Sequence, residues 1–389
     1  MAESFDVVVV GAGITGASTA YHLKQLGVGR VLLLDREGPA AGGTGKSAAI
    51  IRQHYSTPVL SRLTKAGIAM LLGMKEATGH DSGFVQSGWF FLVPADMRAQ
   101  AETNMAMQKK LGIDTRALSR TEIAQRMPWL DPDGIDTVIF ERSGGYADPV
   151  RTTAAFIAGF EKQGGTFWAK TPVRRLLREG DRIVGVESDD DVVPAGTVVN
   201  AAGPWARFLA ESAGLELPLR AVREQDTVWQ ARGNRPLPAS SISNAVDADY
   251  LRPLGQDRFV IGRGFPKEYL DVDPYNYKLT ADDEFIRDVQ ARVERRFPPF
   301  AGMTLLASYA ALYDVTPDWY PFYGPRQGIQ GYADASGGSG HGFKLGPAAG
   351  AELARWIAEG EVAEDFAGLS YDRVPAGRLF ANTFAGNRG

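Results

Sequence analysis

The sequence contains no cysteine and only four histidines, and these absences limit its chemistry. Without cysteine the chain has no disulfide, no thiolate metal ligand and no thiol nucleophile. The histidines at 22, 54, 80 and 341 are not grouped into an acid-base site, and no metal site is predicted. Any cofactor must therefore be held by other side chains and by the backbone.

The charge pattern and the hydropathy of the chain exclude two further classes of protein. The net charge is -4, and the basic residues between Arg292 and Arg296 alternate with acids as on a solvated helix face, so no nucleic-acid partner is expected. No apolar run is long enough to span a membrane, and Glu3 and Asp6 stand where a signal peptide would need positive charge. We therefore expect a soluble cytoplasmic protein, whose 389 residues suffice for a large core or for two domains that share a cleft.

A strand, a glycine-rich turn and a helix open the chain. Phe5 to Val10 is a continuous β-branched run typical of a buried parallel strand, and a second such strand ends at Asp35. Between them, Gly11 permits a tight turn, Gly13 lets the backbone approach a pyrophosphate, and Gly16 lets the helix pack closely. The helix N-terminus offers N-H groups to the phosphates, and the carboxylate at the second strand end can accept ribose hydroxyls. This context predicts a dinucleotide site.

The segment from Ala40 to Ser47 nearly spells the phosphate loop of nucleotide triphosphatases. A phosphate loop follows the first strand of its domain directly, whereas here Arg36 to Pro39 separate the second strand from the match. Because the fingerprint already provides a phosphate cradle, Lys46 and Ser47 are expected beside a cofactor that runs past the second strand.

A second glycine-rich stretch, Gly337 to Gly360, favours FAD as the dinucleotide. It lacks the spacing of the second fingerprint that an NADPH-using flavoprotein carries. The pattern predicts a helix that opens near Pro347, whose backbone donors could meet a cofactor ring or phosphate. A flexible surface loop is the alternative.

The middle of the chain predicts both a parallel and an antiparallel sheet. Pro149 to Lys162 has the pattern of an amphipathic helix, and "TVVNAAGPW" is a buried strand expected beside the first fingerprint strand. The aromatic strands "SGWFFLVP", "TVWQARG" and "RFVIGRG" suggest a second, more antiparallel sheet.

Five ordered pieces make nearly the whole chain resemble the glycine oxidase and sarcosine oxidase branch of the D-amino-acid oxidase superfamily. They are "VVVVGAGITGASTAYHL", "GGYADPVRTTAAFIAGFEKQGGTFWAKTPV", "VVNAAGPWA", "YDVTPDWYPFYGP" and "SGGSGHGFKLGPAAG". The resemblance implies FAD bound by the N-terminal fingerprint. It also implies oxidation of a C-N bond by hydride transfer to flavin N5, after which the imine hydrolyses.

The expected fold class is α/β, or α+β overall, with a Rossmann-like FAD-binding domain and an inserted, mostly antiparallel substrate domain. The FAD-binding domain is expected to comprise residues 1–83, 147–218 and 312–389. The substrate domain is expected to comprise residues 84–146 and 219–311.

The resemblance also assigns roles to individual residues. Arg52 and Lys344 match an arginine and a lysine that grip the substrate carboxylate, and Tyr313 matches a tyrosine over the substrate. A guanidinium fork and an ammonium suit a planar anion, although either residue alone could form a surface ion pair and the tyrosine could be a packed aromatic. The residues expected to bind the cofactor are Gly11, Ala12, Gly13, Ile14, Thr15, Gly16, Asp35, Arg36, Gly43, Thr44, Lys46, Ser47, Ala49, Val173, Ala202, Gly203, Trp205, Gly338, Gly340, His341, Gly342, Phe343 and Lys344.

Several positions depart from the family pattern. Ala311 stands where covalently flavinylated members carry cysteine, and "GTGKSAA" holds no attachment histidine, so noncovalent FAD is expected. Ala49 replaces a second arginine. Val260 and Gly264 fall where sarcosine oxidases carry an oxygen-activating lysine and an active-site histidine.

Without that lysine the sequence does not determine the electron acceptor, because a cation beside the flavin ring stabilises superoxide as it forms. The alternatives are an oxidase that uses oxygen, a dehydrogenase that passes electrons to another acceptor or a partner subunit, a 2-hydroxy-acid oxidising relative, and a flavin-carrying subunit without substrate chemistry of its own.

Overall fold

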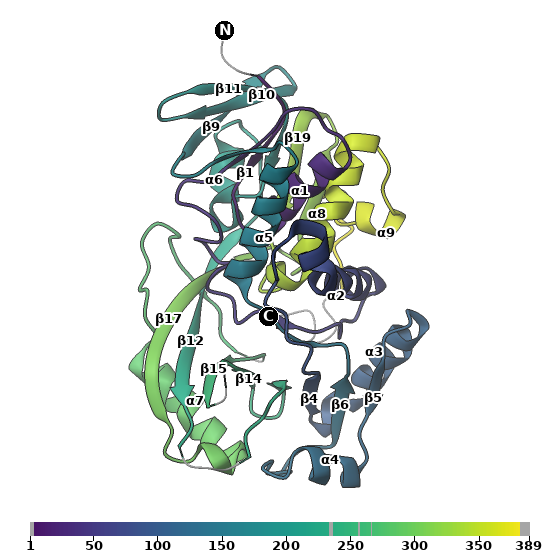
Figure 1. The fold of residues 1–389 in the computed structure, drawn as a ribbon, viewed down its shortest axis with the longest axis vertical. Helices are drawn as coiled ribbons and strands as arrows, with labels where there is room; N and C mark the ends of the chain where they lie inside the picture. Colours follow the sequence, from purple (N-terminus) through teal and green to yellow (C-terminus); the bar gives the residue numbers. More distant parts are fainter. Residues whose placement is uncertain (1–3, 233–235, 256, 266, 382–389) are drawn as a thin grey trace.

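Two β-sheets organise the chain, one in the upper and one in the lower half of Figure 1. The computed structural model describes residues 4–232, 236–255, 257–265 and 267–381. Within this part of the chain, the first sheet has eight strands and the second has nine. The mixed architecture with two sheets confirms the expected fold class.

The first sheet is built around the fingerprint strand. Its parallel centre runs in the order β8 (Thr166–Trp168), β2 (Val31–Leu34), β1 (Phe5–Val10), β11 (Val192–Asn200) and β19 (Ile329–Ser336). At one edge, β18 (Phe322–Arg326) pairs antiparallel with β19, while β9 (Val173–Glu179) and β10 (Arg182–Ser188) extend the sheet beside β11. Because elements cover both faces of β1, its valines are buried on both sides, as the continuous apolar run predicts.

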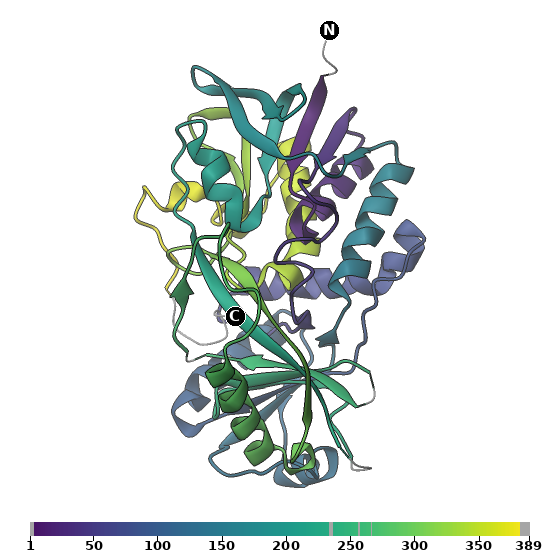
Figure 2. The same ribbon diagram turned by 90° about the vertical axis from the view of Figure 1, so that its left-hand side faces the viewer.

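Helices cover the two faces of the first sheet differently. On one face α1 (Ile14–Gln25), α2 (Pro58–Thr78), α5 (Pro149–Lys162) and α8 (Gly342–Glu359) pack together, as Figures 1 and 2 show. The opposite face packs against the short α6 (Ala206–Glu211) and the β9–β10 hairpin. The carboxyl ends of β1 and β11 therefore point toward the second sheet.

The second sheet is antiparallel except where β13 pairs with β4. Its path is β16 (Leu270–Asp271), β12 (Arg220–Gln230), β15 (Arg258–Arg263), β14 (Asp249–Pro253), β13 (Ser241–Asn244), β4 (Trp89–Val93), β6 (Thr137–Glu141) and β5 (Thr115–Ala117), with β17 (Thr304–Val315) on the other side of β12. The long strands β12 and β17 run from this sheet up to the first one (Figure 2).

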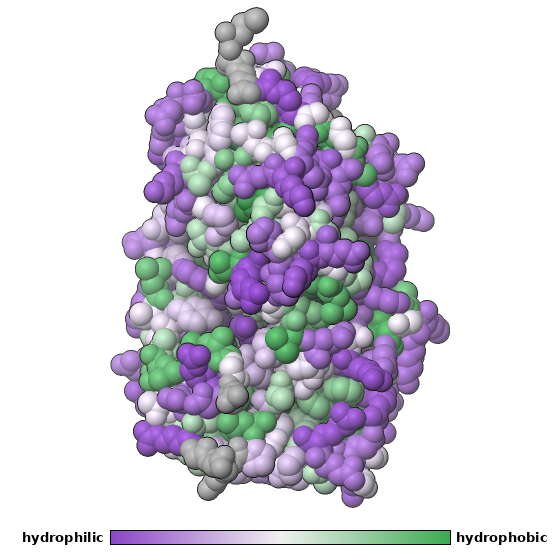
Figure 3. Space-filling view, in the orientation of Figure 1, coloured by the Kyte–Doolittle hydropathy of each residue, from purple (hydrophilic) through white to green (hydrophobic). Residues whose placement is uncertain are grey.

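Shorter elements complete the described chain. Helix α7 (Asp283–Arg296) packs its apolar residues against the second sheet. The remaining elements are α3 (Arg98–Lys110), α4 (Arg120–Arg126), α9 (Glu364–Ala367), the strands β3 (Ile50–Ile51) and β7 (Gly145–Tyr146), and the 3₁₀ turns Ala95–Met97, Gly203–Trp205, Pro298–Phe300 and Tyr371–Arg373. In the part of the chain that the structure describes, no helix combines the length and the apolar character that crossing a membrane requires. On the face drawn in Figure 3, hydrophobic patches alternate with hydrophilic ones.

The bounds of two predicted elements are confirmed and one prediction is wrong. Strand β1 and helix α5 have the bounds read from the sequence. Helix α8, expected to open near Pro347, begins at Gly342. The proline is tolerated inside this helix, where its carbonyl accepts a 2.7 Å hydrogen bond from the hydroxyl of Ser18 on α1. Because α8 packs against α1, it starts at Gly342, five residues before the start that the position of Pro347 indicates.

A buried ion pair fastens the C-terminal segment to the loop between β17 and β18. The Arg373 guanidinium donates to both carboxylate oxygens of Asp318 at 2.8 and 2.9 Å, and both side chains are buried. We expect Arg373→Ala to lower the free energy of unfolding by about 3–5 kcal/mol, because it leaves a buried carboxylate without its partner. Urea denaturation monitored by circular dichroism measures this loss.

The matched control is Arg355→Ala on α8, which removes only exposed ion pairs with neighbouring glutamates. Its expected cost is less than about 1 kcal/mol. Equal midpoints for the two variants would show that the pair with Asp318 adds no stability.

Candidate functional site

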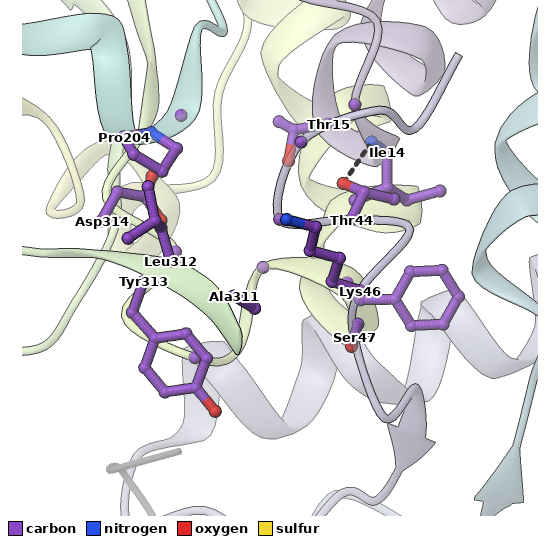
Figure 4. Close-up of a pocket in the computed structure, with 18 of the residues that line it drawn as sticks. Ile14, Thr15, Thr44, Lys46, Ser47, Pro204, Ala311, Leu312, Tyr313 and Asp314 are labelled. Carbon is purple, nitrogen blue, oxygen red and sulfur yellow. Dashed lines mark hydrogen bonds between the residues drawn. The ribbon is translucent and has the colours of Figure 1, made fainter. Parts of the chain in front are cut away.

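A cavity of about 400 Å³ begins at the carboxyl ends of β1, β2 and β11 and extends to the second sheet. Residues of the glycine turn, of the 41–49 loop and of the first turn of α8 form its upper walls. Figure 4 shows Ile14, Thr44 and Lys46 on one side of it and Leu312 and Tyr313 on the other. The cavity thus joins the dinucleotide fingerprint to side chains from the second sheet.

The glycine turn adopts a conformation that other residues avoid. Gly11 has a φ of 110°, and a Cβ there would lie 2.3 Å from the carbonyl oxygen of Ala201. At the next glycine, Gly13, the backbone is extended and leads into α1. The Ile14 N-H donates to the hydroxyl of Thr44 at 3.1 Å, which ties the 41–49 loop to the helix N-terminus (Figure 4). The turn and the loop together form a cradle at the N-terminus of α1, the end of a helix that favours a phosphate group.

The carboxylate at the end of β2 organises the turn beside it. Asp35 accepts 2.8 Å hydrogen bonds from the N-H groups of Ala12 and Glu37, and a third bond of 2.9 Å from Gly38. It also lines the cavity, and a carboxylate that accepts three hydrogen bonds can accept one more, as from a ribose hydroxyl. Beside it the Arg36 guanidinium stacks 3.7 Å above the ring of Trp205. This end of the cavity therefore combines a carboxylate with a guanidinium that lies over an aromatic ring.

Most of the predicted cofactor residues line this single cavity. The three that do not are Ala12, Gly16 and His341. Ala12 is buried and donates its N-H to the carboxylate of Asp35, and a Cβ on Gly16 would lie 1.9 Å from the carbonyl oxygen of Gly11. The buried imidazole of His341 lies 3.2 Å, Nδ1 to Oη, from the hydroxyl of Tyr55. These three residues support the cavity wall from behind.

Arg52, Lys344 and Tyr313, predicted to act on the substrate, also line the cavity. The buried Arg52 guanidinium lies 4.8 Å from the ring centroid of Tyr55 and 5.8 Å from that of Trp89, and it donates to the carbonyl of His54. Burial, and then the charge of Arg52, hold the pKa of Lys344 well below its ordinary value. An anion that binds beside both side chains would raise the pKa of Lys344 and favour its charged form.

Burial raises the pKa of the Tyr313 hydroxyl well above its usual range, and the neighbouring carboxylates Glu224 and Asp226 add to the rise. The phenol therefore stays protonated and can serve as a donor to a ligand. Its ring lies on β17, opposite Val222 of β12.

Sequence reasoning missed an acidic wall on the second sheet. Glu224 and Asp226 on β12 line the cavity with Tyr250 on β14, whose hydroxyl donates to the Asp226 carboxylate at 2.7 Å. Burial raises the pKa of Asp226 to about 7, against the effect of that hydrogen bond. The spacing of two in "REQD" was the available signal, because alternate residues of a strand share a face.

A buried cation near Tyr313 was also missed. Lys267 donates to Glu224 at 2.5 Å, and its Nζ lies 5.7 Å from the centroid of the tyrosine ring. Of the two positions read as losses, Gly264 lines the cavity and Val260 does not. The sequence register at these positions stays a prediction.

Two buried polar atoms on the cavity wall suit a dinucleotide with a polar ring system. Neither the indole N-H of Trp205 nor the hydroxyl of Ser336 has a hydrogen-bond partner within the described residues, and both side chains line the cavity. An unsatisfied buried donor is costly, so an occupant with acceptors is expected there. Together with the glycine cradle and the Asp35 carboxylate, these residues fit bound FAD.

Comparisons with known proteins agree on one family. The family model described as FAD dependent oxidoreductase matches residues 6–356. The mitochondrial sarcosine dehydrogenase of Mus musculus is 27% identical over 94% of this chain and 41% of its own length. The sarcosine oxidase subunit beta of Rhizobium meliloti (strain 1021) is 25% identical over 96% of this chain and 89% of its own.

A solved structure of L-proline dehydrogenase from P. horikoshii superposes with a TM-score of 0.88 and 26% identity, over 98% of this chain and 100% of that one. The chain spans less than half the length of the mouse relative. The family model, however, covers both sheets and the whole cavity. The chain belongs to the FAD dependent oxidoreductase family, and the resemblance read from its sequence is confirmed.

Proposed function

We propose that the chain uses FAD to oxidise the C-N bond of a small carboxylate-bearing amine, either an amino acid or an N-alkyl amino acid. The observation that carries this proposal is the presence of Arg52 and Lys344 in the same cavity as the dinucleotide fingerprint. The names of the relatives, which include sarcosine and dimethylglycine dehydrogenases, support an N-alkyl amino acid as the substrate class.

In this proposal the chain's own residues bind and orient the substrate. The fork of Arg52 and the ammonium of Lys344 hold the carboxylate by charge-assisted hydrogen bonds, which fixes the direction of the C-H bond that breaks. The carboxylate raises the pKa of the lysine and so keeps it charged in the complex. Tyr313 remains protonated and donates from the opposite wall. Bound FAD supplies the hydride acceptor, and the imine product is hydrolysed by water.

The division of labour between the sheets stays part of the proposal. Residues 1–83, 147–218 and 312–389 are assigned to FAD binding, and residues 84–146 and 219–311 to the substrate. The assignment is supported by the fingerprint on the first sheet and the acidic wall on the second. Since Ala311 offers no thiol, FAD is proposed to bind without a covalent link.

Two electron acceptors remain candidates. Oxygen as the acceptor is supported by the Lys267–Glu224 ion pair, whose ammonium lies 5.7 Å from the ring centroid of Tyr313 and can stabilise developing negative charge nearby. A non-oxygen acceptor reached through a partner subunit is supported by the relative named as a beta subunit. The cytoplasmic location expected from the sequence stays a prediction.

The test is to mix the FAD-loaded protein without oxygen with glycine, sarcosine, proline, D-alanine and lactate, and to follow the flavin absorbance. We expect sarcosine or proline to bleach the flavin, because a bound carboxylate presents its C-H bond to the ring. Readmitting air then separates the two acceptors: rapid return of the colour identifies an oxidase, and slow return a dehydrogenase.

Bleaching by lactate alone would replace the amine proposal with a 2-hydroxy-acid substrate. Absence of bleaching by every compound, in protein that retains its yellow colour, would favour a flavin-carrying subunit without substrate chemistry.

A further inference from the structure

A buried glutamate lies behind the cationic end of the cavity. Glu141 ends β6, where it pairs with Trp89 of the neighbouring strand β4. Its side chain is fully buried, and its Oε1 accepts a 2.7 Å hydrogen bond from the N-H of Gln53. Its other oxygen, Oε2, has no hydrogen-bond partner within the described part of the chain. The carboxyl group is thus attached to the residue that follows Arg52.

The backbone around Glu141 is shaped for this contact. A Cβ at Gly144 would lie 2.8 Å from Cβ of Trp89, 3.0 Å from the carbonyl oxygen of Ile51 and 3.3 Å from Oε1 of Glu141. A side chain there would collide with Trp89 and the Ile51 carbonyl and would crowd the carboxyl group of Glu141. The same segment pairs with β7, where Ile51 is opposite Gly145. The backbone is therefore held on both sequence neighbours of Arg52, at Ile51 by β7 and at Gln53 by the Glu141 carboxyl group.

The charges around Glu141 are few and of known sign. Burial raises its pKa to about 8, while the Gln53 N-H and the Arg52 charge oppose the rise. His54 is neutral, because burial and then Arg52 lower its pKa to about 3. Burial keeps the Tyr55 hydroxyl protonated by raising its pKa, and Glu141 adds to the rise. At this end burial and the Arg52 charge also lower the pKa of Lys344, on α8, while elsewhere in the same cavity burial raises the pKa of Asp226 and of Asp249 to about 7.

We propose that Glu141 is a positioning residue for the substrate carboxylate: it holds the Arg52 backbone through Gln53, and its ionisation sets the net positive charge that this end of the cavity offers to an anion. The proposal rests on the carboxylate-binding role proposed for Arg52. With Glu141 protonated, the carboxylate meets the full charge of Arg52. With Glu141 ionised, that charge is partly neutralised from behind, and the anion binds more weakly.

A comparison of Glu141 with Glu141→Gln separates the hydrogen bond to Gln53 from the effect of ionisation. Glu141→Gln keeps the volume and an acceptor oxygen for the Gln53 N-H, but it cannot ionise. The probe is acetate, with acetamide as its neutral isostere, titrated calorimetrically into the FAD-loaded protein. Measurements at about pH 7 and about pH 9.5 lie on either side of the transition of Glu141.

For the wild-type protein we expect the acetate Kd to rise at least about fivefold between the two pH values, since a buried charge acts through a low dielectric. Lys344→Met, which retains Glu141, should keep part of this rise. The rise in Kd that Lys344→Met retains is the contribution of Glu141, and it should be absent in Glu141→Gln. At the lower pH the acetate Kd of Glu141→Gln should stay within about twofold of the wild-type value. Acetamide should show no such dependence in any variant.

Equal pH profiles for wild type and Glu141→Gln would overturn the inference. If Glu141→Gln does not fold, Glu141→Asp takes its place: its carboxyl still ionises, so the rise must persist in Lys344→Met/Glu141→Asp, and a flat profile overturns the inference. Arg52→Ala distinguishes a failure of the carboxylate grip from a failure of the role of Glu141. If Arg52→Ala binds acetate as tightly as wild type, the proposed carboxylate grip fails; if it binds weakly while the wild-type and Glu141→Gln profiles coincide, only the role of Glu141 fails.

Discussion

Arg52→Ala is expected to lower kcat/KM for a carboxylate-bearing amine by about 100- to 1000-fold, in line with the loss of a buried, charge-assisted contact. Arg52 is 8% exposed, and its guanidinium lies 4.8 Å from the ring centroid of Tyr55 and 5.8 Å from that of Trp89, so two aromatic rings define its place on the cavity wall. Its removal takes away the fork that binds and orients the substrate, so KM should rise and kcat should fall. Anaerobic flavin reduction at a series of substrate concentrations separates the two effects.

Two controls make this result specific. Arg52→Lys keeps the charge but loses the planar fork, and we expect its kcat/KM to be about tenfold higher than that of Arg52→Ala. An N-methyl amine without a carboxylate should be a poor substrate for the wild-type protein and should lose almost nothing more in Arg52→Ala. Equal losses for substrates with and without the carboxylate would instead indicate general damage to the cavity.

The features that local sequence determines were predictable. The fingerprint strand Phe5–Val10 is a run of residues buried on both faces, and a glycine turn follows it directly. The bounds of α5 could also be read, because Asp148 caps its first turn and Pro149 occupies its first position. In both cases the signal lies within a few residues of the element.

The acidic wall and Glu141 were not predictable, because they depend on strand register between distant segments. Tyr250 lies opposite Gly262 on β15, and a Cβ at that glycine would come within 2.6 Å of the Asp226 carboxylate. Glu141 reaches Gln53 across 88 residues of sequence. No local periodicity encodes such pairs, whereas the predicted Arg52 and Lys344 came from motifs that a family resemblance makes visible.

Gly13→Val is expected to yield folded protein that has lost at least about 90% of its FAD, because a branched side chain fills the space that the pyrophosphate needs. The backbone at Gly13 has φ -72° and ψ 178°, values that valine adopts readily. A Cβ there would meet only the Thr44 hydroxyl, at 3.1 Å, so the substitution changes the cradle more than the fold. The ratio of flavin to protein absorbance measures the loss, and circular dichroism reports the fold.

Two further glycines calibrate this result. Gly73→Val, on α2 where a Cβ would meet nothing within 4 Å, should retain its FAD. Gly11→Val should lose both the flavin and much of its stability, because the position has a φ of 110° and its Cβ would overlap the Ala201 carbonyl. If Gly13→Val purified with a full complement of FAD, the turn after β1 would not be the pyrophosphate site. The pyrophosphate would then have to bind at another wall of the cavity. The substrate orientation proposed for Arg52 and Lys344 would no longer be defined, because it assumes a flavin bound through this turn.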